Sequence, residues 1–136
     1  MRIELTETTV IGNIAAVTRT LQTLRAMQIG IALDDFGTGC AGLDYLQTLP
    51  FSSLKIDKSL VQQMQGSGRS SQIVKSALEL SRTLGLNTVA EGIEDALTAR
   101  VLADMGCNYA QGYHFARPMP MAEVIAWAAG YKPQQL

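Results

Sequence analysis

Two adjacent aspartates, Asp34 and Asp35, are the residues of this 136-residue chain whose spacing most suggests chemistry. They follow an apolar run and precede a glycine-containing loop, in the segment IALDDFGTG. This order is typical of a buried strand that delivers charge at its carboxyl end. Neighbouring carboxylates repel each other, and a divalent metal ion often compensates them because it takes oxygen ligands. The alternative is an acidic turn exposed to water.

Lys55 is a second residue suited to chemistry, because it lies between Leu54 and Ile56 in the motif LKID. An amine in this position can orient a water molecule or offset negative charge that develops on a phosphate. The alternative is a surface lysine whose stem covers apolar groups while its amine stays in water. A lysine seldom sits unpaired in the middle of an inward-facing strand, which favours a role at a site.

Several helices are expected to position these residues. Apolar residues at helical spacing predict helices that follow Asn13, span Gly42 to Thr48, follow Ser71 and run from Leu97 to Met105, with a last helix from Met121 to Ala129. Three of the helices are expected to stop at Gly30, Gly85 and Gly106, and the segment GSGRSS at 66–71 is expected to be a loop and candidate N-cap.

Short strands are predicted between these helices, at 3–9, 31–33 and 54–57 and within the segments NTVAEGIE and NYAQGYHF. A helix, a glycine, a short apolar strand and a polar residue follow one another three times. This order is typical of β/α units in a parallel sheet, whose ligand site lies at the carboxyl ends of the strands. We therefore expect five side chains to converge there, namely Glu4, Asp34, Lys55, Glu91 and Gln111.

Such a cluster of acids suggests metal-assisted phosphoryl chemistry. Clustered carboxylates can hold a pair of magnesium or manganese ions, which polarise a phosphoryl oxygen and lower the pKa of a bridging water. The single histidine, His114, is expected to be an ordinary loop or strand-end residue, since no second ligand is spaced to join it.

The composition indicates one globular domain over residues 1–136, with 47 % hydrophobic and 17 % charged residues. A net charge of -1 with scattered basic residues gives no footprint for a nucleic-acid polymer. No apolar run approaches the ~20 residues of a membrane span, so no membrane contact is expected. Cys40 and Cys107 are too few for a disulfide framework, which favours a cytoplasmic location.

Five motifs resemble, in order and spacing, the EAL-domain family of cyclic di-GMP phosphodiesterases. They are ELTE at 4–7, DDFGTG at 34–39, LKID at 54–57, VAEGIE at 89–94 and AQGYHFARP at 110–118. The resemblance implies a TIM-type barrel and the cleavage of one phosphodiester bond of cyclic di-GMP, with Mg²⁺ or Mn²⁺ as cofactor and pGpG as product.

The resemblance also implies a role for each motif residue. Glu4, Asp34 and Asp35 match metal ligands, and Glu91 matches a ligand of the metal or of its water. Lys55 matches the lysine that positions water.

The remaining matches concern the substrate and a loop. Gln111 matches a glutamine on the substrate or water side, and Glu7 matches an acid that braces the loop after the two aspartates. Phe115, Arg117 and Pro118 lie where the family approaches a guanine.

The resemblance covers only part of a barrel. The glutamate of the family's Glu-Ala-Leu motif and an asparagine ligand both precede the region that ELTE begins, so the first metal would lose two ligands. A complete barrel needs about 250 residues. We therefore expect an α/β fold that is an incomplete TIM-type (β/α) barrel, with about five parallel strands and flanking helices. Its open edges predict either a homo-oligomer or a complementing N-terminal half.

Two functions stay open on this basis. The first is a phosphodiesterase fragment, which the retained acids and Lys55 favour. The second is a catalytically inactive EAL-like module that binds cyclic di-GMP weakly or mediates protein-protein interaction, which the missing ligands favour.

Overall fold

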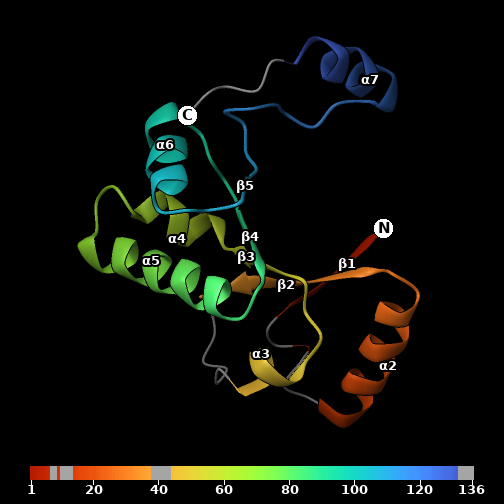
Figure 1. The fold of residues 1–136 in the computed structure, drawn as a ribbon. Coiled ribbons are helices and arrows are strands. Elements are labelled where there is room, and N and C mark those ends of the chain that lie inside the picture. The colour runs from red at the N-terminus through yellow and green to blue at the C-terminus, as the bar shows by residue number, and fades with distance from the viewer. Residues whose placement is uncertain (7–8, 10–13, 38–43, 132–136) are drawn as a thin grey trace.

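The protein is built around a five-stranded parallel sheet whose strands lie in sequence order, β1-β2-β3-β4-β5 (Figure 1). The computed structural model describes residues 1–6, 9, 14–37 and 44–131, without the side chain of Asp44. The strands are β1 (Arg2–Thr6), β2 (Gly30–Phe36), β3 (Ser53–Ile56), β4 (Asn87–Ala90) and β5 (Tyr109–Ala110). The predicted α/β class and parallel sheet of an incomplete barrel are confirmed.

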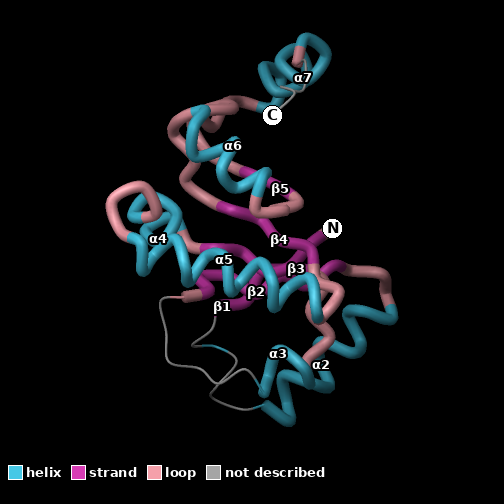
Figure 2. The backbone as a smooth tube through the Cα atoms, turned by 60° about the vertical axis from the view of Figure 1, so that its left-hand side comes forward, coloured by secondary structure: helices cyan, strands magenta, loops and turns pink. Residues whose placement is uncertain are grey.

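Helices connect successive strands, as parallel pairing requires. They are α2 (Ile14–Ala26), α3 (Asp44–Thr48), α4 (Lys58–Gln63), α5 (Gly68–Thr83), α6 (Ala96–Asp104) and α7 (Met121–Gly130). Helix α2 contacts β2, and α5 contacts α4, β3 and β4. Figure 2 shows α5 crossing the strands on one side of the sheet. Helix α7 follows β5 and stands apart from the other helices (Figure 1).

The core lies between the sheet and its helices. On β3, Leu54 and Ile56 are fully buried in the apolar cluster, together with Val74 of α5 and Leu102 of α6. Side chains alternate between the two faces of a strand. Lys55 therefore points to the opposite face from Leu54 and Ile56, toward the inside of the incomplete barrel.

Helix ends differ from the predictions in two places. Gly85 and Gly106 follow α5 and α6 with positive φ, as expected for glycines that end helices. However, α2 ends at Ala26, and Gln28 rather than Gly30 takes the left-handed conformation, while Gly30 opens β2. Helix α5 begins at Gly68, inside the predicted loop 66–71, because the Ser67 side chain caps it by accepting from Ser70 N–H.

Three other elements depart from the sequence patterns. Helix α4 was not predicted, because its six residues are too few to show helical periodicity. Strand β2 continues through Asp34 and Asp35 to Phe36, beyond the predicted range of 31–33. Strand β1 ends at Thr6, and the predicted cap Asn13 lies outside the described residues.

Within the described ranges, none of the helices is long and apolar enough to cross a bilayer.

Asp95 caps α6, and its loss should destabilise this helix. Its carboxylate accepts from Thr98 N–H at 2.8 Å and from the Thr98 hydroxyl at 2.7 Å. These bonds, the backbone one first, lower the pKa of Asp95 below its ordinary value of 3.8. Asp95→Ala should therefore lower the melting temperature at neutral pH, measured by circular dichroism. A lowered pKa means that this stabilisation is present above pH 3.8 and is lost as the pH falls through the folded-state value.

The matched control is Asp104→Ala, which removes an exposed acid at the other end of α6. An acid there faces the negative end of the helix dipole, so this change should not lower the melting temperature. Equal losses for the two variants would contradict the capping role of Asp95.

Candidate active site

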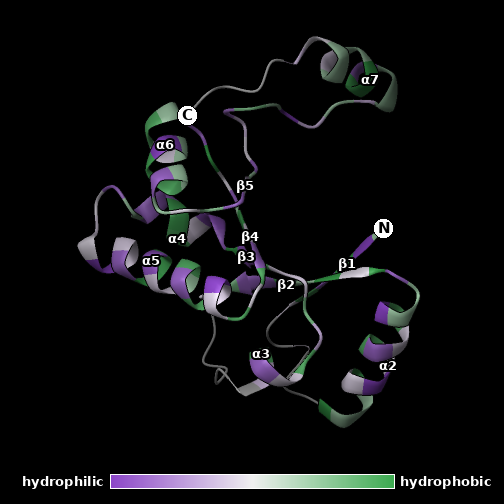
Figure 3. Cartoon of the chain, viewed as in Figure 1, coloured by the Kyte–Doolittle hydropathy of each residue, from purple (hydrophilic) through white to green (hydrophobic). Residues whose placement is uncertain are grey.

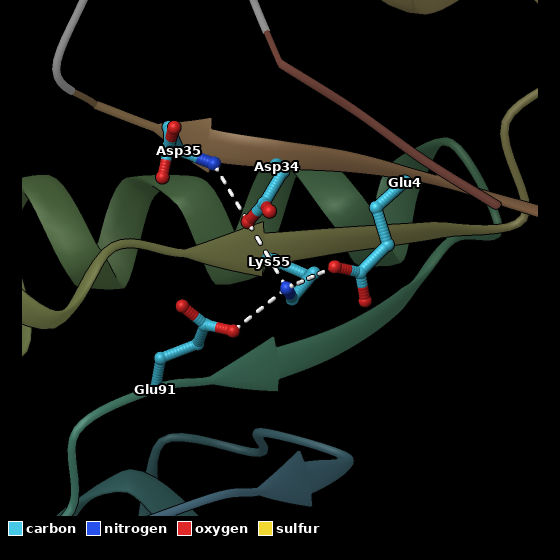
Figure 4. Close-up of polar contacts among 5 residues, drawn as sticks. All are labelled: Glu4, Asp34, Asp35, Lys55 and Glu91. Atoms are coloured by element: carbon cyan, nitrogen blue, oxygen red, sulfur yellow. Dashed lines mark hydrogen bonds and ion pairs between the residues drawn. The ribbon is translucent and has the colours of Figure 1, made fainter.

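Lys55 lies at the centre of three carboxylates that come from different elements (Figure 4). Its Nζ is 2.8 Å from Glu4 Oε2, 2.8 Å from Glu91 Oε1 and 3.2 Å from Asp34 Oδ1. The Lys55 side chain is only 8 % exposed, whereas those of Asp34 and Glu91 are 20 % exposed and that of Glu4 is 48 % exposed. The sheet therefore brings four of the predicted site residues together at one place.

Strand register explains how these residues meet. Thr6 pairs with Asp34, so Glu4 lies on the neighbouring strand, two residues before the partner of Asp34. Lys55 pairs with Val89, and Glu91 comes two residues later along the same chain. Residues two apart on a strand share a face. Glu4, Asp34, Lys55 and Glu91 therefore all reach the inner face, near the carboxyl ends of the strands.

Lys55 is a permanent cation in this environment. Burial disfavours its charge and is the largest influence, but hydrogen bonds to Glu4, Glu91 and Asp34 together outweigh it and raise the pKa of Lys55 above its ordinary value of 10.5. Lys55 therefore cannot serve as a base near neutral pH. One positive charge faces three carboxylates, which leaves an excess of negative charge at the site.

An irregularity at the end of β2 directs the side chains of Asp34 and Asp35 to different positions. The pairing of β2 with β3 shifts register between Leu33 and Phe36, and Asp35 adopts a φ of 59°. Such bulges re-aim side chains near active sites, and aspartate tolerates the left-handed conformation better than most residues. The Asp34 carboxylate accepts from Asp35 N–H at 3.0 Å while it pairs with Lys55. In Figure 4 the Asp35 N–H points to the Asp34 carboxylate, whereas the Asp35 carboxylate lies apart from the group around Lys55.

The acids at this site have the chemistry of a hard-metal site. Carboxylate oxygens are the donors that Mg²⁺, Mn²⁺ and Ca²⁺ prefer. In the described part of the chain, however, no three acids, histidines or cysteines are arranged closely enough to surround an ion by themselves. The Lys55 ammonium lies between Glu4, Asp34 and Glu91 instead. The donor set fits a divalent cation, and the metal-ligand roles stay a prediction.

Gln111 lies beside the acidic cluster. Its backbone N–H donates to Ala90 O at 2.8 Å, directly before Glu91. Gln111, Glu91 and Tyr113 line one cavity of about 210 Å³ together with Lys58 and Glu94. Gln111 and Glu91 therefore line the same cavity, and a substrate-side role for the Gln111 amide stays a prediction.

Three residues are predicted to approach a guanine, namely Phe115, Arg117 and Pro118, and they do not lie at one place in the structure. Arg117 stacks over the ring of Tyr113, 5.0 Å from its centroid, so it lies near the cavity that holds Glu91. Pro118 is exposed. Phe115 packs against the core and lines a different cavity, with Trp127. A guanine contact by these residues stays a prediction, and the loop-bracing Glu7 lies outside the described residues.

The sequence patterns did not predict the contacts between α4 and Glu94, which hold the loop that follows Glu91. Glu94 pairs with Lys58 at 3.2 Å and accepts from Gln62 Nε2 at 2.9 Å. Lys58 and Gln62 are four residues apart on α4 and therefore share a helix face. The four-residue spacing of Lys58 and Gln62 places them on one helix face, but this can be inferred only if residues 58–63 are known to form a helix.

Comparisons with known proteins identify the family of this chain. The model of the EAL domain family matches residues 1–118. The chain is 41 % identical over 127 residues to the cyclic di-GMP phosphodiesterase RocR of Pseudomonas aeruginosa. This match covers 93 % of this chain and 32 % of RocR.

Solved structures give the same result. One, described as the PaMucR phosphodiesterase in complex with c-di-GMP, has a TM-score of 0.87 and 40 % identity, over 90 % of this chain and 50 % of that one. The manganese and cyclic di-GMP complex of Klebsiella pneumoniae BlrP1 has a TM-score of 0.80 and 36 % identity, over 86 % of this chain and 30 % of that one. The chain thus spans half or less of each of these proteins. Because the family model matches residues 1–118 of the 136, the chain belongs to the EAL domain family.

Proposed function

We propose that this chain is the C-terminal part of a metal-dependent phosphodiesterase domain that hydrolyses cyclic di-GMP to pGpG. The observation that carries the proposal is the set of three carboxylates around Lys55 at the carboxyl end of the sheet. RocR is a cyclic di-GMP phosphodiesterase, and the similar MucR structure contains the same dinucleotide. A cytoplasmic location is part of the same proposal, since cyclic di-GMP would have to reach this site.

The proposed cofactor is Mg²⁺ or Mn²⁺, held by Glu4, Asp34, Asp35 and Glu91. Support comes from the oxygen donors of these residues and from BlrP1, which has been solved with manganese and with calcium beside cyclic di-GMP. When bound, such an ion polarises a phosphoryl oxygen and lowers the pKa of a coordinated water.

The protein's own groups would act around the scissile phosphate. Lys55 carries a positive charge that can offset negative charge on the phosphate. Its three N–H groups face Glu4, Asp34 and Glu91 in this structure, so the ammonium can donate to the attacking water once one of these carboxylates is released.

The Gln111 amide, which shares a cavity with Glu91, can donate to a substrate oxygen. Tyr113 and Arg117 form the rim on this side and can stack with a base.

A second candidate is a catalytically inactive module that binds cyclic di-GMP or a protein. One observation favours it, namely that Lys55 occupies the centre of the described carboxylates and no three acids among the described residues surround a position for an ion. The two candidates differ in whether product forms when the rest of an EAL domain is supplied.

A single-chain fusion tests the proposal. The part of the MucR phosphodiesterase domain that precedes the matched region is joined to residues 1–136, and the fusion is incubated with cyclic di-GMP and MnCl₂. We expect pGpG by liquid chromatography, and we expect Glu91→Gln to lower its rate at least about 100-fold. A folded fusion that binds cyclic di-GMP without forming pGpG would overturn the proposal in favour of the binding module.

A further inference from the structure

The Lys55 ammonium spends its hydrogen-bonding capacity on the three acids around it. Its Nζ lies 2.8 Å from Glu4 Oε2, 2.8 Å from Glu91 Oε1 and 3.2 Å from Asp34 Oδ1. An ammonium has three N–H donors and accepts no hydrogen bond. Three carboxylates therefore match its three donors, and this arrangement of the described residues leaves no donor for a water molecule or a phosphate oxygen.

Lys55 reaches this position from the middle of an apolar strand. Its neighbours Leu54 and Ile56 are fully buried on the other face of β3, and the Lys55 side chain is itself only 8 % exposed. Figure 3 shows the hydrophilic colour interrupting the hydrophobic colour along β2 and β3. A charge withdrawn this far from water persists only when it is paired. The point at which the carboxylates converge is therefore held by a group of the chain itself.

A divalent cation that uses the same acids needs the same space. Mg²⁺ binds carboxylate oxygens at about 2.0–2.1 Å, and Ca²⁺ binds them at about 2.3–2.6 Å. A cation that takes oxygens from two of the acids has to stand between them, where Nζ stands. An ammonium so close to a divalent cation would also be strongly repelled by it. Lys55 and a shared cation are therefore competitors for these oxygens.

The charge of the cluster favours the cation in this competition. The three carboxylates and the ammonium of Lys55 leave two negative charges, which one divalent cation can neutralise. Glu4 is the most exposed of the three acids, since its side chain is 48 % exposed against 20 % for Asp34 and Glu91. A cation arriving from water therefore meets Glu4 first.

We propose that Lys55 is an internal counter-ion that a bound divalent cation displaces. Before the cation binds, the ammonium holds Glu4, Asp34 and Glu91 together. Binding takes at least two of these carboxylates from Lys55, and the N–H groups that are released can then donate to a water molecule or a phosphate oxygen. Loading of the cation thus makes Lys55 available for chemistry. This inference rests on the metal site of the proposed function, and it concerns the state of Lys55 rather than the cleavage of a substrate.

The alternative is a cation that binds at the outer side of the acids. Each of the three carboxylates has a second oxygen besides the one that faces Nζ, and a cation on those oxygens would leave the contacts of Lys55 intact. The two arrangements differ in whether the Lys55 ammonium keeps its three acceptors. A direct observation of this ammonium therefore decides between them.

Nuclear magnetic resonance of the lysine side chains gives this observation. The 136-residue chain is labelled with ¹⁵N-lysine and titrated with MgCl₂, because Mg²⁺ is diamagnetic. An ammonium held by three acceptors exchanges its protons slowly with water, whereas an exposed one, such as Lys75 on α5, exchanges quickly. We expect one slowly exchanging ammonium signal that disappears with MgCl₂ and persists in KCl of the same ionic strength. A Lys55 signal that persists unchanged in MgCl₂, or the absence of a slowly exchanging signal before MgCl₂ is added, would overturn the proposal.

Two matched variants measure the competition itself. Lys55→Met removes the group that the cation has to displace, and Lys75→Met makes the same change on the exposed side of α5. Electron paramagnetic resonance of free Mn²⁺ gives the affinity, after circular dichroism has shown that each variant is folded. Lys55→Met should bind Mn²⁺ at least about tenfold more tightly than wild type, and Lys75→Met should bind it within about twofold. Equal or weaker binding by Lys55→Met would contradict the competition. The experiment on the labelled wild-type chain stands even if Lys55→Met does not fold.

These results separate the inference from the proposed function. If the MucR fusion forms pGpG while the Lys55 signal of the chain ignores MgCl₂, only the displacement of Lys55 is wrong. If MgCl₂ removes the Lys55 signal and the fusion forms no pGpG, only the proposed hydrolysis is wrong.

Discussion

Lys55→Met should lower the free energy of unfolding by about 3 kcal/mol, measured by urea denaturation. The substitution removes the cation that, among the described residues, pairs with Glu4, Asp34 and Glu91, and it leaves these carboxylates to repel one another. Breaking a buried ion pair costs about 3–5 kcal/mol, and the lower end applies here because the carboxylates keep some contact with water.

Lys58→Met is the matched control for this loss. Lys58 forms a similar pair with Glu94 at 3.2 Å, but the two side chains are 54 % and 53 % exposed. An exposed pair contributes at most about 1 kcal/mol, so the control should lose little. Equal losses would contradict the central position of Lys55 in the site.

The pH dependence of the Lys55 contribution follows from the direction of its pKa shift. The pKa of Lys55 is raised in the folded protein, so its stabilising effect is fully present below the ordinary value of 10.5. The effect is lost only as the pH rises through the higher folded-state value. The difference in stability between wild type and Lys55→Met should therefore not change through the neutral range.

Gly112→Ala should also cost about 3 kcal/mol, because the backbone leaves no room for a side chain. A Cβ at this position would lie 2.1 Å from the carbonyl oxygen of Ile93 and 2.3 Å from its nitrogen. Ile93 N–H donates to Gln111 O at 3.1 Å, and His114 N–H donates to Ile93 O at 3.0 Å. The substitution must therefore separate the loop that carries Glu91 from the turn that carries Gln111.

Gly66→Ala is the control for Gly112→Ala. No atom lies within 4 Å of a Cβ built at Gly66, so this change should alter stability by less than about 1 kcal/mol and can be slightly stabilising. Urea denaturation of the two variants gives the comparison. A Gly112→Ala protein as stable as Gly66→Ala would show that the two segments are not held as closely as described.

The sequence predicted the sheet and most of the cluster because both depend on regular patterns. Apolar runs followed by polar residues marked the strand ends, and parallel pairing then required those ends to meet. The pairing of Lys55 with Glu4, Asp34 and Glu91 agrees with this reasoning. The prediction needed no knowledge of side-chain geometry, only of strand direction.

Other features depend on information that patterns do not carry. The bulge at Asp34 and Asp35 arises from the pairing of β2 with β3, and nothing in the segment IALDDFGTG specifies it. The contacts between α4 and Glu94 require a six-residue helix that is too short to show periodicity. Phe115 packs against the apolar core cluster, whose residues come from elements spread along the chain, so its own segment does not indicate this packing.

Binding of Mn²⁺ to the fusion of this chain with the N-terminal part of the MucR domain tests most directly whether Glu4, Asp34 and Glu91 belong to one metal site. Electron paramagnetic resonance follows the loss of the signal of the free ion for wild type, Asp34→Asn and Asp104→Asn, the last being an exposed acid on α6. We predict that wild type and Asp104→Asn bind the ion equally and that Asp34→Asn binds it at least about tenfold more weakly. Equal binding by Asp34→Asn and wild type, or no binding by any of the three, would contradict the account.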